Sequence, residues 1–183
     1  MQTDFLVIGS GIAGLTYALK VAEACPKKTI TILTKTQSDE TNTKYAQGGI
    51  AGVMDFDHDS FQKHIDDTLV AGDGLCDKNI VEIVIKEGVE RINEIIEWGT
   101  RFDKETDGDY KLGKEGVTGN EIERALLDAI NRKPNIRLLN HCFVLDIITQ
   151  HHLGYLITKS TPNIECYGVY VLILATNKPE KML

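Results

Sequence analysis

The sequence predicts an α/β fold, in which a parallel sheet with helices is followed by an antiparallel three-stranded β-meander. The apolar run Phe5–Ile8 leads into a glycine-rich turn at 9–14 and then into a segment with helical character. A β-branched run at 29–34 follows, which gives a β-α-β unit of about thirty residues, the usual size. Runs rich in strand-forming residues, separated by turn residues, then make up most of 142–174.

The bulk composition is that of a globular protein. The chain has 183 residues, of which 42% are hydrophobic and 26% charged, enough for one domain with a core. Its net charge of −7 disfavours a nucleic-acid surface. We expect no membrane span, because no apolar run approaches the roughly 18–20 residues that a bilayer requires. We expect no signal peptide, because the N-terminus leads straight into a strand with no basic region ahead of an apolar one. The widely spaced cysteines predict reduced thiols in a cytoplasmic protein: Cys25, Cys76, Cys142 and Cys166.

The glycine-rich turn follows the G-x-G-x-x-G pattern of dinucleotide-binding folds, and it lies between a predicted strand and a predicted helix. Gly9 permits the tight turn, Gly11 lets a pyrophosphate approach the backbone, and Gly14 lets the helix pack on the strand. The N–H groups that begin a helix would then face the anion. The pattern therefore predicts a Rossmann-like dinucleotide site at Gly9, Ser10, Gly11, Ile12, Ala13 and Gly14.

The end of the second predicted strand argues against NAD as the dinucleotide. NAD-binding folds usually place Asp or Glu there, where the carboxylate binds the ribose hydroxyls. This chain has Thr34 and Lys35 instead. A lysine at that point suits an adenosine ribose or a phosphate.

The first half of the chain continues with mainly helical patterns. The first helix, 15–24, should end at Cys25-Pro26, because proline cannot continue a helix. A short strand is expected at 50–54, after a polar stretch. Helices are then predicted at 60–70 and at 79–98, the second with an apolar stripe formed by Ile80, Ile83, Val84, Val89, Ile92, Ile95 and Ile96. Asp77 is positioned to cap that second helix.

The second half begins with a segment, 102–116, that has charges, glycines and no period, so a loop is expected. A capping box formed by Thr118 and Glu121 predicts a helix that ends near Ile130. The third parallel strand is expected at 136–139. The meander strands are expected at 142–149, 155–158 and 165–174, and the final residues 177–183 are polar and mixed.

Two groups of residues could be imagined as metal sites. Asp55, Asp57 and Asp59 surround His58, but a solvated turn before the next helix is the better interpretation. His151-His152 lies in a predicted hairpin turn with no nearby carboxylate or cysteine partner in sequence. We therefore expect no metal.

Four stretches taken together are more specific than any one motif: VIGSGIAGL, ILTK, NTKYAQGGIAGV and DDTLVAGDGLCD. They resemble the flavoprotein family of succinate dehydrogenase, fumarate reductase and L-aspartate oxidase, and within it the aspartate oxidase branch. The resemblance implies FAD as cofactor. Relatives that bind the flavin covalently carry a histidine in H-T-x-x-A-Q-G-G, where this chain has Asn42. Because asparagine cannot make that bond, the resemblance implies non-covalent FAD.

The resemblance also implies roles for individual residues. Ser10 to Ala13 would wrap the pyrophosphate, and Lys35 would lie near the adenosine. Glu115 matches a family glutamate that orients the substrate amine, and it is the single expected catalytic residue. The flavin would be lined by Asn42, Thr43, Lys44, Tyr45, Ala46, Gln47, Gly48 and Gly49.

The function implied by the resemblance is FAD-dependent oxidation of L-aspartate to iminoaspartate, with oxygen or fumarate as acceptor. That reaction is the first step of de novo NAD biosynthesis, which implies a functional link to quinolinate synthase. Two alternatives stay open. One is a soluble fumarate reductase flavoprotein, and the other is a nucleotide-binding fragment without catalysis.

The resemblance also implies that residues 1–183 are a partial FAD-binding domain, without the capping domain and the C-terminal helical domain of the family. A family segment that carries histidines and an arginine has no counterpart between Gly116 and Val117. Asn177 lies where the family's next flavin-contacting strand has glycine. We therefore expect this fragment to be inactive, and to expose apolar surface that favours oligomerisation or low solubility.

Overall fold

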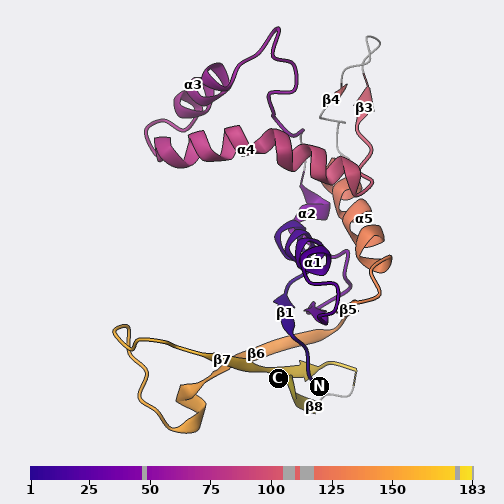
Figure 1. Ribbon diagram of the computed structural model, residues 1–183, viewed down its shortest axis with the longest axis vertical. Coiled ribbons are helices and arrows are strands. Elements are labelled where there is room, and N and C mark those ends of the chain that lie inside the picture. The colour runs from indigo at the N-terminus through magenta and orange to yellow at the C-terminus, as the bar shows by residue number, and fades with distance from the viewer. Residues whose placement is uncertain (47–48, 105–109, 112–117, 176–177, 183) are drawn as a thin grey trace. The chain divides into compact units, whose positions relative to one another are not determined.

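The computed structural model describes residues 1–46, 49–104, 110–111, 118–175 and 178–182 (Figure 1). It divides into two compact units. Unit 1 comprises Met1–Asn42 with Leu127–Leu183, and unit 2 comprises Thr43–Leu126.

The centre of unit 1 is a parallel sheet of three strands, β1 (Phe5–Ile8), β2 (Ile30–Leu33) and β5 (Ile136–Leu139). The spatial order is β1-β2-β5, and the register aligns Val7 with Ile32 and Ile32 with Leu138. All four residues of β2 are buried, as expected for a central strand with both faces covered. All three strands lie where the sequence predicts them.

Helix α1 (Ile12–Ala24) covers one face of this sheet and connects β1 to β2. Its buried residues follow the i, i+3, i+4, i+7 spacing of a single face: Leu15, Ala18, Leu19 and Ala22. Each fully buried leucine contributes about 1.5–3 kcal/mol relative to an exposed one. The helix ends at Cys25, before Pro26, which confirms the predicted end.

The other face of the sheet packs against an antiparallel meander of β6 (Cys142–Thr149), β7 (Cys166–Ile173) and β8 (Lys178–Met182), paired in that order. Figure 1 shows β6 and β7 as a long two-stranded ribbon. The buried cluster between the two sheets contains Leu33, Cys142, Val169, Val171 and Met182, with Leu6, Leu139, Val144 and Ile173 packed against it. The α/β fold with a three-stranded meander is thus confirmed.

The strands that form the meander differ from the expected strands in two places. Residues 155–158 form no strand, because β6 pairs directly with β7 from Cys142↔Ile173 to Thr149↔Cys166 and leaves no position between them. The connection contains instead a short 3-10 helix, Gln150–Leu153. The third strand is β8, in the polar and mixed tail where the sequence analysis places no strand. Pro179 is tolerated there because β8 is an edge strand.

Unit 2 is mainly helical. Helices α3 (Phe61–Ala71) and α4 (Lys78–Glu97) pack against each other (Figure 1). The Ser60 hydroxyl accepts the Lys63 N–H at 3.2 Å, and the Asp77 carboxylate accepts the Asn79 N–H at 2.9 Å. These two caps fix where α3 and α4 begin, and the second confirms the expected cap.

The apolar stripe predicted on α4 is only partly buried. Ile92 and Ile95 are buried, as expected, and Ile85 joins them from outside the predicted stripe. The first turns instead expose their apolar side chains, with Ile80 at 56%, Ile83 at 51% and Val84 at 62%. Helical spacing therefore identified the helix correctly, but described residues of this chain cover only the second half of its apolar face.

Three further differences from the predicted secondary structure lie between residues 42 and 111. The expected strand at 50–54 is absent, and of those residues only Val53 is fully buried. Residues Asn42–Tyr45 form a short helix, α2. A two-stranded pair, β3 (Asp103–Lys104) with β4 (Tyr110–Lys111), lies inside the expected loop.

Helix α5 (Thr118–Asn131) runs from unit 2 into unit 1. Its predicted end near Ile130 is confirmed. Its first helical residue is Thr118. The capping box of Thr118 with Glu121 stays a prediction, because the residue before the helix lies outside the described residues. Among the helices that the described residues form, none combines the length and apolar character needed to cross a membrane.

Candidate cofactor site

The glycine-rich turn of unit 1 has a backbone that only glycine adopts easily. Gly9 has φ of +102°, in the region that L-residues with a Cβ rarely occupy. Its N–H donates to the Leu33 carbonyl at 2.8 Å, which fastens the turn to the end of β2. A Cβ placed on Gly14 would collide with the carbonyl oxygen of Gly9. Both glycines therefore have the structural roles that the sequence predicts.

Ser10, the second residue of the turn, is 2% exposed. Its hydroxyl donates to the Ser38 carbonyl at 2.8 Å. This bond joins the turn to the loop that follows β2. The buried Ser10 side chain thus holds the turn in place by its bond to Ser38. The backbone of the turn is then the part that can contact a ligand.

The N-terminus of α1 is suited to an anion. Gly11 is the cap residue, and the Leu15 N–H donates to its carbonyl at 3.0 Å. The first turn contains no acidic side chain that would repel a negative ligand. The helix dipole and the N–H groups of the first turn favour a phosphate at this position. The residues from Gly9 to Gly14 therefore fit the pyrophosphate of a dinucleotide.

The loop after β2 carries the other predicted residue of unit 1. Thr34 is buried, and its N–H donates to the Leu139 carbonyl at 3.0 Å. Lys35 follows and is exposed at the carboxyl edge of the sheet. Dinucleotides bind outside this edge in α/β folds, and a contact between Lys35 and the adenosine stays a prediction.

Sequence reasoning missed a polar group at this same edge. Gln37, on the loop after β2, is hydrogen-bonded to Asn140 at 3.1 Å, and its amide nitrogen lies 3.2 Å from Nε2 of His141. Asn140 and His141 follow β5, more than one hundred positions further along the chain. No local pattern could have indicated the pairing.

The predicted flavin-lining residues are divided between the units. Asn42 ends unit 1, whereas Thr43 to Gly49 belong to unit 2. Asn42, Thr43, Lys44 and Tyr45 form α2, and the Lys44 ammonium lies 5.9 Å from the centre of the Tyr45 ring. Ala46 and Gly49 are exposed. Gln47 and Gly48 lie outside the described residues, and so does Glu115.

Gly119 is a second residue that the sequence analysis missed. A Cβ there would collide with the carbonyl oxygen of Thr43 and come within 2.7 Å of the carbonyl oxygen of Ala46. Helix α5 can therefore lie against α2 only because residue 119 is glycine. The available signal was glycine near the start of a predicted helix, where alanine is a better helix former by about 1 kcal/mol.

A charged group next to this contact holds the start of α5. Arg124 donates to the Glu121 carboxylate at 2.6 and 2.8 Å, and the Arg101 N–H donates to it at 3.0 Å. The hydrogen bonds from Arg124 are the main reason that the pKa of Glu121 is lowered from its ordinary value. Glu121 therefore stays ionised and holds the Arg101 N–H, while Arg124 donates to the Gly99 carbonyl at 3.1 Å.

The two groups considered as metal sites have other partners. Asp55 accepts from the Asp57 N–H at 2.9 Å and contacts His58 Nδ1 at 2.6 Å, within an exposed turn. His152 accepts the Thr149 N–H through Nδ1 and contacts Asp146 through Nε2. The described part of the chain holds no group of three or more His, Cys, Asp or Glu side chains arranged for a metal.

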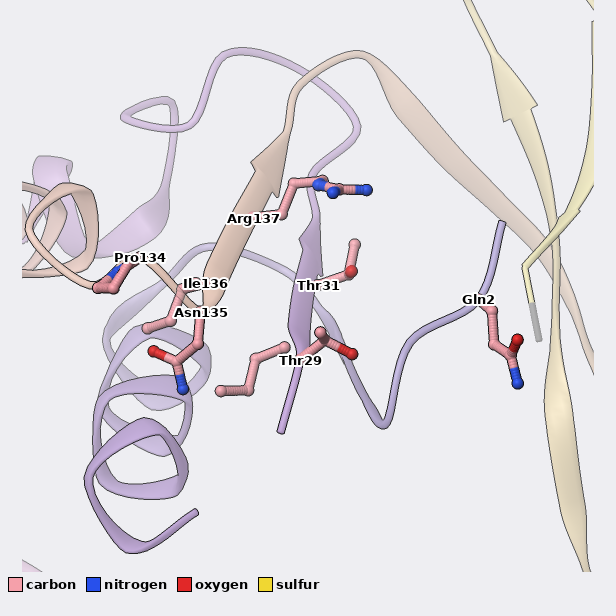
Figure 2. Close-up of a pocket in the computed structure, with 8 residues that line it drawn as sticks. Gln2, Thr29, Thr31, Pro134, Asn135, Ile136 and Arg137 are labelled. Carbon is pink, nitrogen blue, oxygen red and sulfur yellow. The ribbon is translucent and has the colours of Figure 1, made fainter. Parts of the chain in front are cut away.

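A separate open pocket of about 190 Å³ lies in unit 1 (Figure 2). It is lined by Gln2, Thr29, Ile30, Thr31, Pro134, Asn135, Ile136 and Arg137. These residues lie at or before the amino ends of β1, β2 and β5, whereas the glycine turn follows the carboxyl end of β1. Because the strands are parallel, the pocket is at the opposite edge of the sheet and is no part of the cofactor site.

Comparison with known proteins agrees with this geometry. The chain is 42% identical over 187 residues to "L-aspartate oxidase, chloroplastic" of Arabidopsis thaliana, covering 96% of this chain and 27% of that protein. It is 35% identical over 206 residues to L-aspartate oxidase of Yersinia pestis, covering 98% of this chain and 38% of that protein. The chain thus spans 27% and 38% of the length of these two curated relatives.

A similar solved structure is FrdA of E. coli quinol fumarate reductase, with a TM-score of 0.81 and 25% identity over 100% of this chain and 31% of that chain. The family model for the FAD binding domain matches residues 4–182. Because this match spans nearly the whole chain and the glycine turn has the shape that a pyrophosphate requires, the chain belongs to the FAD binding domain family, whose cofactor is FAD.

Proposed function

We propose that this chain is the FAD-binding part of an L-aspartate oxidase. The observation that carries the proposal is the identity of 42% to the Arabidopsis relative, found together with a glycine turn of the required shape. In the proposed reaction L-aspartate loses two electrons and two protons across its Cα–N bond and becomes iminoaspartate. Oxygen is then reduced to hydrogen peroxide, or fumarate to succinate. The proposed place of this reaction is the first step of de novo NAD biosynthesis, with a functional link to quinolinate synthase.

FAD, when bound, supplies the two-electron acceptor, and the protein supplies binding, orientation and charge. In unit 1, the backbone from Ser10 to Ala13 would hold the pyrophosphate at the start of α1, and Lys35 would lie near the adenosine. Residues 42–49 would line the flavin. Asn42 has no nucleophilic ring nitrogen, which supports a non-covalent cofactor. Glu115 is proposed to accept a hydrogen bond from the substrate amine and so to orient it.

The polypeptide of residues 1–183 is proposed to be a partial FAD-binding domain that holds FAD but does not turn over by itself. This part of the proposal rests on the length of the relatives, of which the chain matches 27% and 38%. A dicarboxylate substrate needs cationic groups to hold both of its carboxylates. The proposed location of the intact protein is the cytoplasm, although the Arabidopsis relative is named chloroplastic.

The first experiment is a titration of the purified chain with FAD, followed by quenching of flavin fluorescence. Saturable binding is expected, and acid precipitation should release all of the flavin into the supernatant. Flavin that stays with the precipitate would contradict non-covalent binding. The chain should release no hydrogen peroxide from L-aspartate, and robust release would contradict the proposed inactivity of this polypeptide.

The second candidate function is that of a soluble fumarate reductase, which the likeness to E. coli quinol fumarate reductase favours. The two functions differ in the reductant of the flavin. In the intact protein, L-aspartate but not succinate should bleach the flavin absorbance under anaerobic conditions. Bleaching by succinate alone would support the fumarate reductase. Bleaching by neither would favour a nucleotide-binding protein without catalysis.

A further inference from the structure

The carboxyl ends of β2 and β5 are joined by a chain of side-chain hydrogen bonds to which the proposed function gives no role. Asn140 Nδ2 donates to Gln37 Oε1 at 3.1 Å, and Gln37 Nε2 lies 3.2 Å from His141 Nε2. Because the Gln37 oxygen accepts from Asn140, its amide nitrogen is the donor to His141. One glutamine thus bridges two consecutive residues of the loop after β5.

The backbone of His141 is fixed from both sides. Its N–H donates to the Thr36 carbonyl at 3.1 Å, and its carbonyl accepts the Leu174 N–H at 2.9 Å. Its φ is +57°, which is uncommon for a residue other than glycine. Such a conformation persists where the surroundings hold it in place. The backbone of His141 is therefore held in place, and the hydrogen bond from Gln37 orients its ring.

The loop that Gln37 anchors also supports the glycine turn. Ser38, the next residue, accepts the hydroxyl of the buried Ser10 at 2.8 Å. Hydrogen bonds thus tie the loop after β2 to the loop after β5 through Gln37 and to the glycine turn through Ser38, and the peptide link between Gln37 and Ser38 connects the two contacts. In dinucleotide-binding folds the end of the second strand faces the adenosine ribose, and the glycine turn faces the pyrophosphate. The connected segments would thus surround the adenosine diphosphate half of FAD.

We propose that Gln37 and His141 are positioning residues for the adenosine diphosphate half of FAD. Together they clamp the loop after β2 between the loop after β5 and the glycine turn. They act through Ser38 and Ser10 and not through the redox chemistry. The proposal rests on FAD as the cofactor, and it is independent of L-aspartate as the substrate.

The test is isothermal titration calorimetry of the 183-residue chain with FAD and, separately, with ADP. Gln37→Ala should raise both dissociation constants by about fivefold, the effect of losing support worth roughly one hydrogen bond. His141→Gly should do the same, because it removes the ring and keeps the backbone unstrained. His141→Asn should restore most of the affinity, since asparagine tolerates positive φ and keeps a polar side chain.

The double variant Gln37→Ala/His141→Gly should bind FAD no more weakly than either single variant, because both remove the same clamp. Full additivity of the two losses would overturn the proposed coupling. So would a Gln37→Ala variant that binds FAD and ADP as the unaltered chain does.

Gln150 provides a matched control. Its amide also bridges two loop groups, donating to the Asn163 carbonyl at 3.0 Å and accepting the Glu165 N–H at 2.9 Å. Gln150→Ala should lower the melting temperature about as much as Gln37→Ala does and leave both dissociation constants unchanged. Equal weakening of binding by both variants would show a general structural effect and overturn the proposal.

The outcomes separate this inference from the proposed oxidase. An unaltered chain that binds neither FAD nor ADP would overturn the positioning role. An intact protein in which Gln37→Ala weakens FAD binding, but whose flavin L-aspartate never reduces, would support the positioning role and contradict only the oxidase.

Discussion

The hydroxyl of Ser10 donates to the carbonyl oxygen of Ser38 at 2.8 Å, and Ser10 is 2% exposed. This single bond connects the middle of the glycine turn to the loop after the second parallel strand. Removing the hydroxyl leaves the Ser38 carbonyl without that donor. The geometry of the turn, and with it the affinity for FAD, should therefore depend on this contact.

Ser10→Ala is expected to lower the free energy of unfolding by about 1 kcal/mol, the usual value for one hydrogen bond. The dissociation constant for FAD should rise about fivefold or more. Urea denaturation and fluorescence titration measure the two effects. Ser160→Ala is the matched control, because Ser160 is exposed and bonds only across its own loop to Thr158 in the described structure. Equal effects of the two variants would contradict this account.

Gly14→Ala should abolish measurable FAD binding. The added Cβ would collide with the Gly9 carbonyl, and overpacking of this kind typically costs about 1–3 kcal/mol. Relief of the collision would have to displace either α1 or the turn. The measurements are urea denaturation and FAD titration.

The control for this variant is Gly88→Ala. A Cβ on Gly88, within α4, meets no atom within 4 Å. This variant should stabilise the protein by about 0.5–1 kcal/mol, because alanine is the better helix former. A Gly14→Ala chain with unaltered stability and FAD affinity would show that the turn tolerates a side chain.

Gly119→Ala should separate α5 from α2, because the added Cβ would meet the carbonyl oxygens of Thr43 and Ala46. The free energy of unfolding should fall by about 1–3 kcal/mol. Amide hydrogen exchange should accelerate at residues 43–46. Asn120→Ala, at the neighbouring exposed position, should change neither quantity appreciably. Unchanged exchange in Gly119→Ala would mean that α2 does not depend on this contact.

Asp4 should make the protein acid-sensitive. Its carboxylate accepts from Lys28 Nζ at 2.8 Å, and from the N–H and hydroxyl of Thr29 at 2.8 Å each. The hydrogen bond from Lys28, followed by those from Thr29, holds the pKa of Asp4 well below its ordinary value. A folded-state pKa that is lowered means that this stabilisation is present above the unfolded pKa, near 3.9, and is lost as the pH falls further.

Asp4→Asn should therefore lower the urea midpoint at pH 7, and the difference from the unaltered protein should shrink as the pH is lowered below about 4. Asp73→Asn, at an exposed turn position, is the control and should show no such convergence. A constant difference between Asp4→Asn and the unaltered protein from pH 7 to pH 2 would exclude this origin of the acid sensitivity.

Elements with a strong local pattern could be predicted from the sequence. The glycine spacing predicts the turn. Short apolar or β-branched runs predict β1 and β2, and helical spacing predicts α1. The fold class could be predicted for that reason. FAD could be predicted because the motifs around Gly9 and Asn42 resemble those of one family. Lys35 could be placed at the carboxyl edge of the sheet because the β-α-β unit has a known geometry.

Elements that depend on a partner could not be predicted in this way. Residues 155–158 have the composition of a strand, but β6 and β7 pair directly with each other. Residues Lys178–Met182 are polar and contain proline, yet they form an edge strand because β7 offers an unpaired side. Ile80 and Val84 fit an apolar helix face, but no described residue of this chain covers them.

By itself, the sequence determined the parallel unit and the dinucleotide turn, because both depend on short-range spacing, and its resemblance to one flavoprotein family implied FAD as the cofactor. Only the tertiary structure decided that Ser10 rests on Ser38, that Gln37 bridges to His141, and that Gly119 lets α5 approach α2. These contacts join residues that are distant in the chain, and their energies depend on distances of a few ångströms. A linear pattern does not carry those distances, because packing in three dimensions sets them.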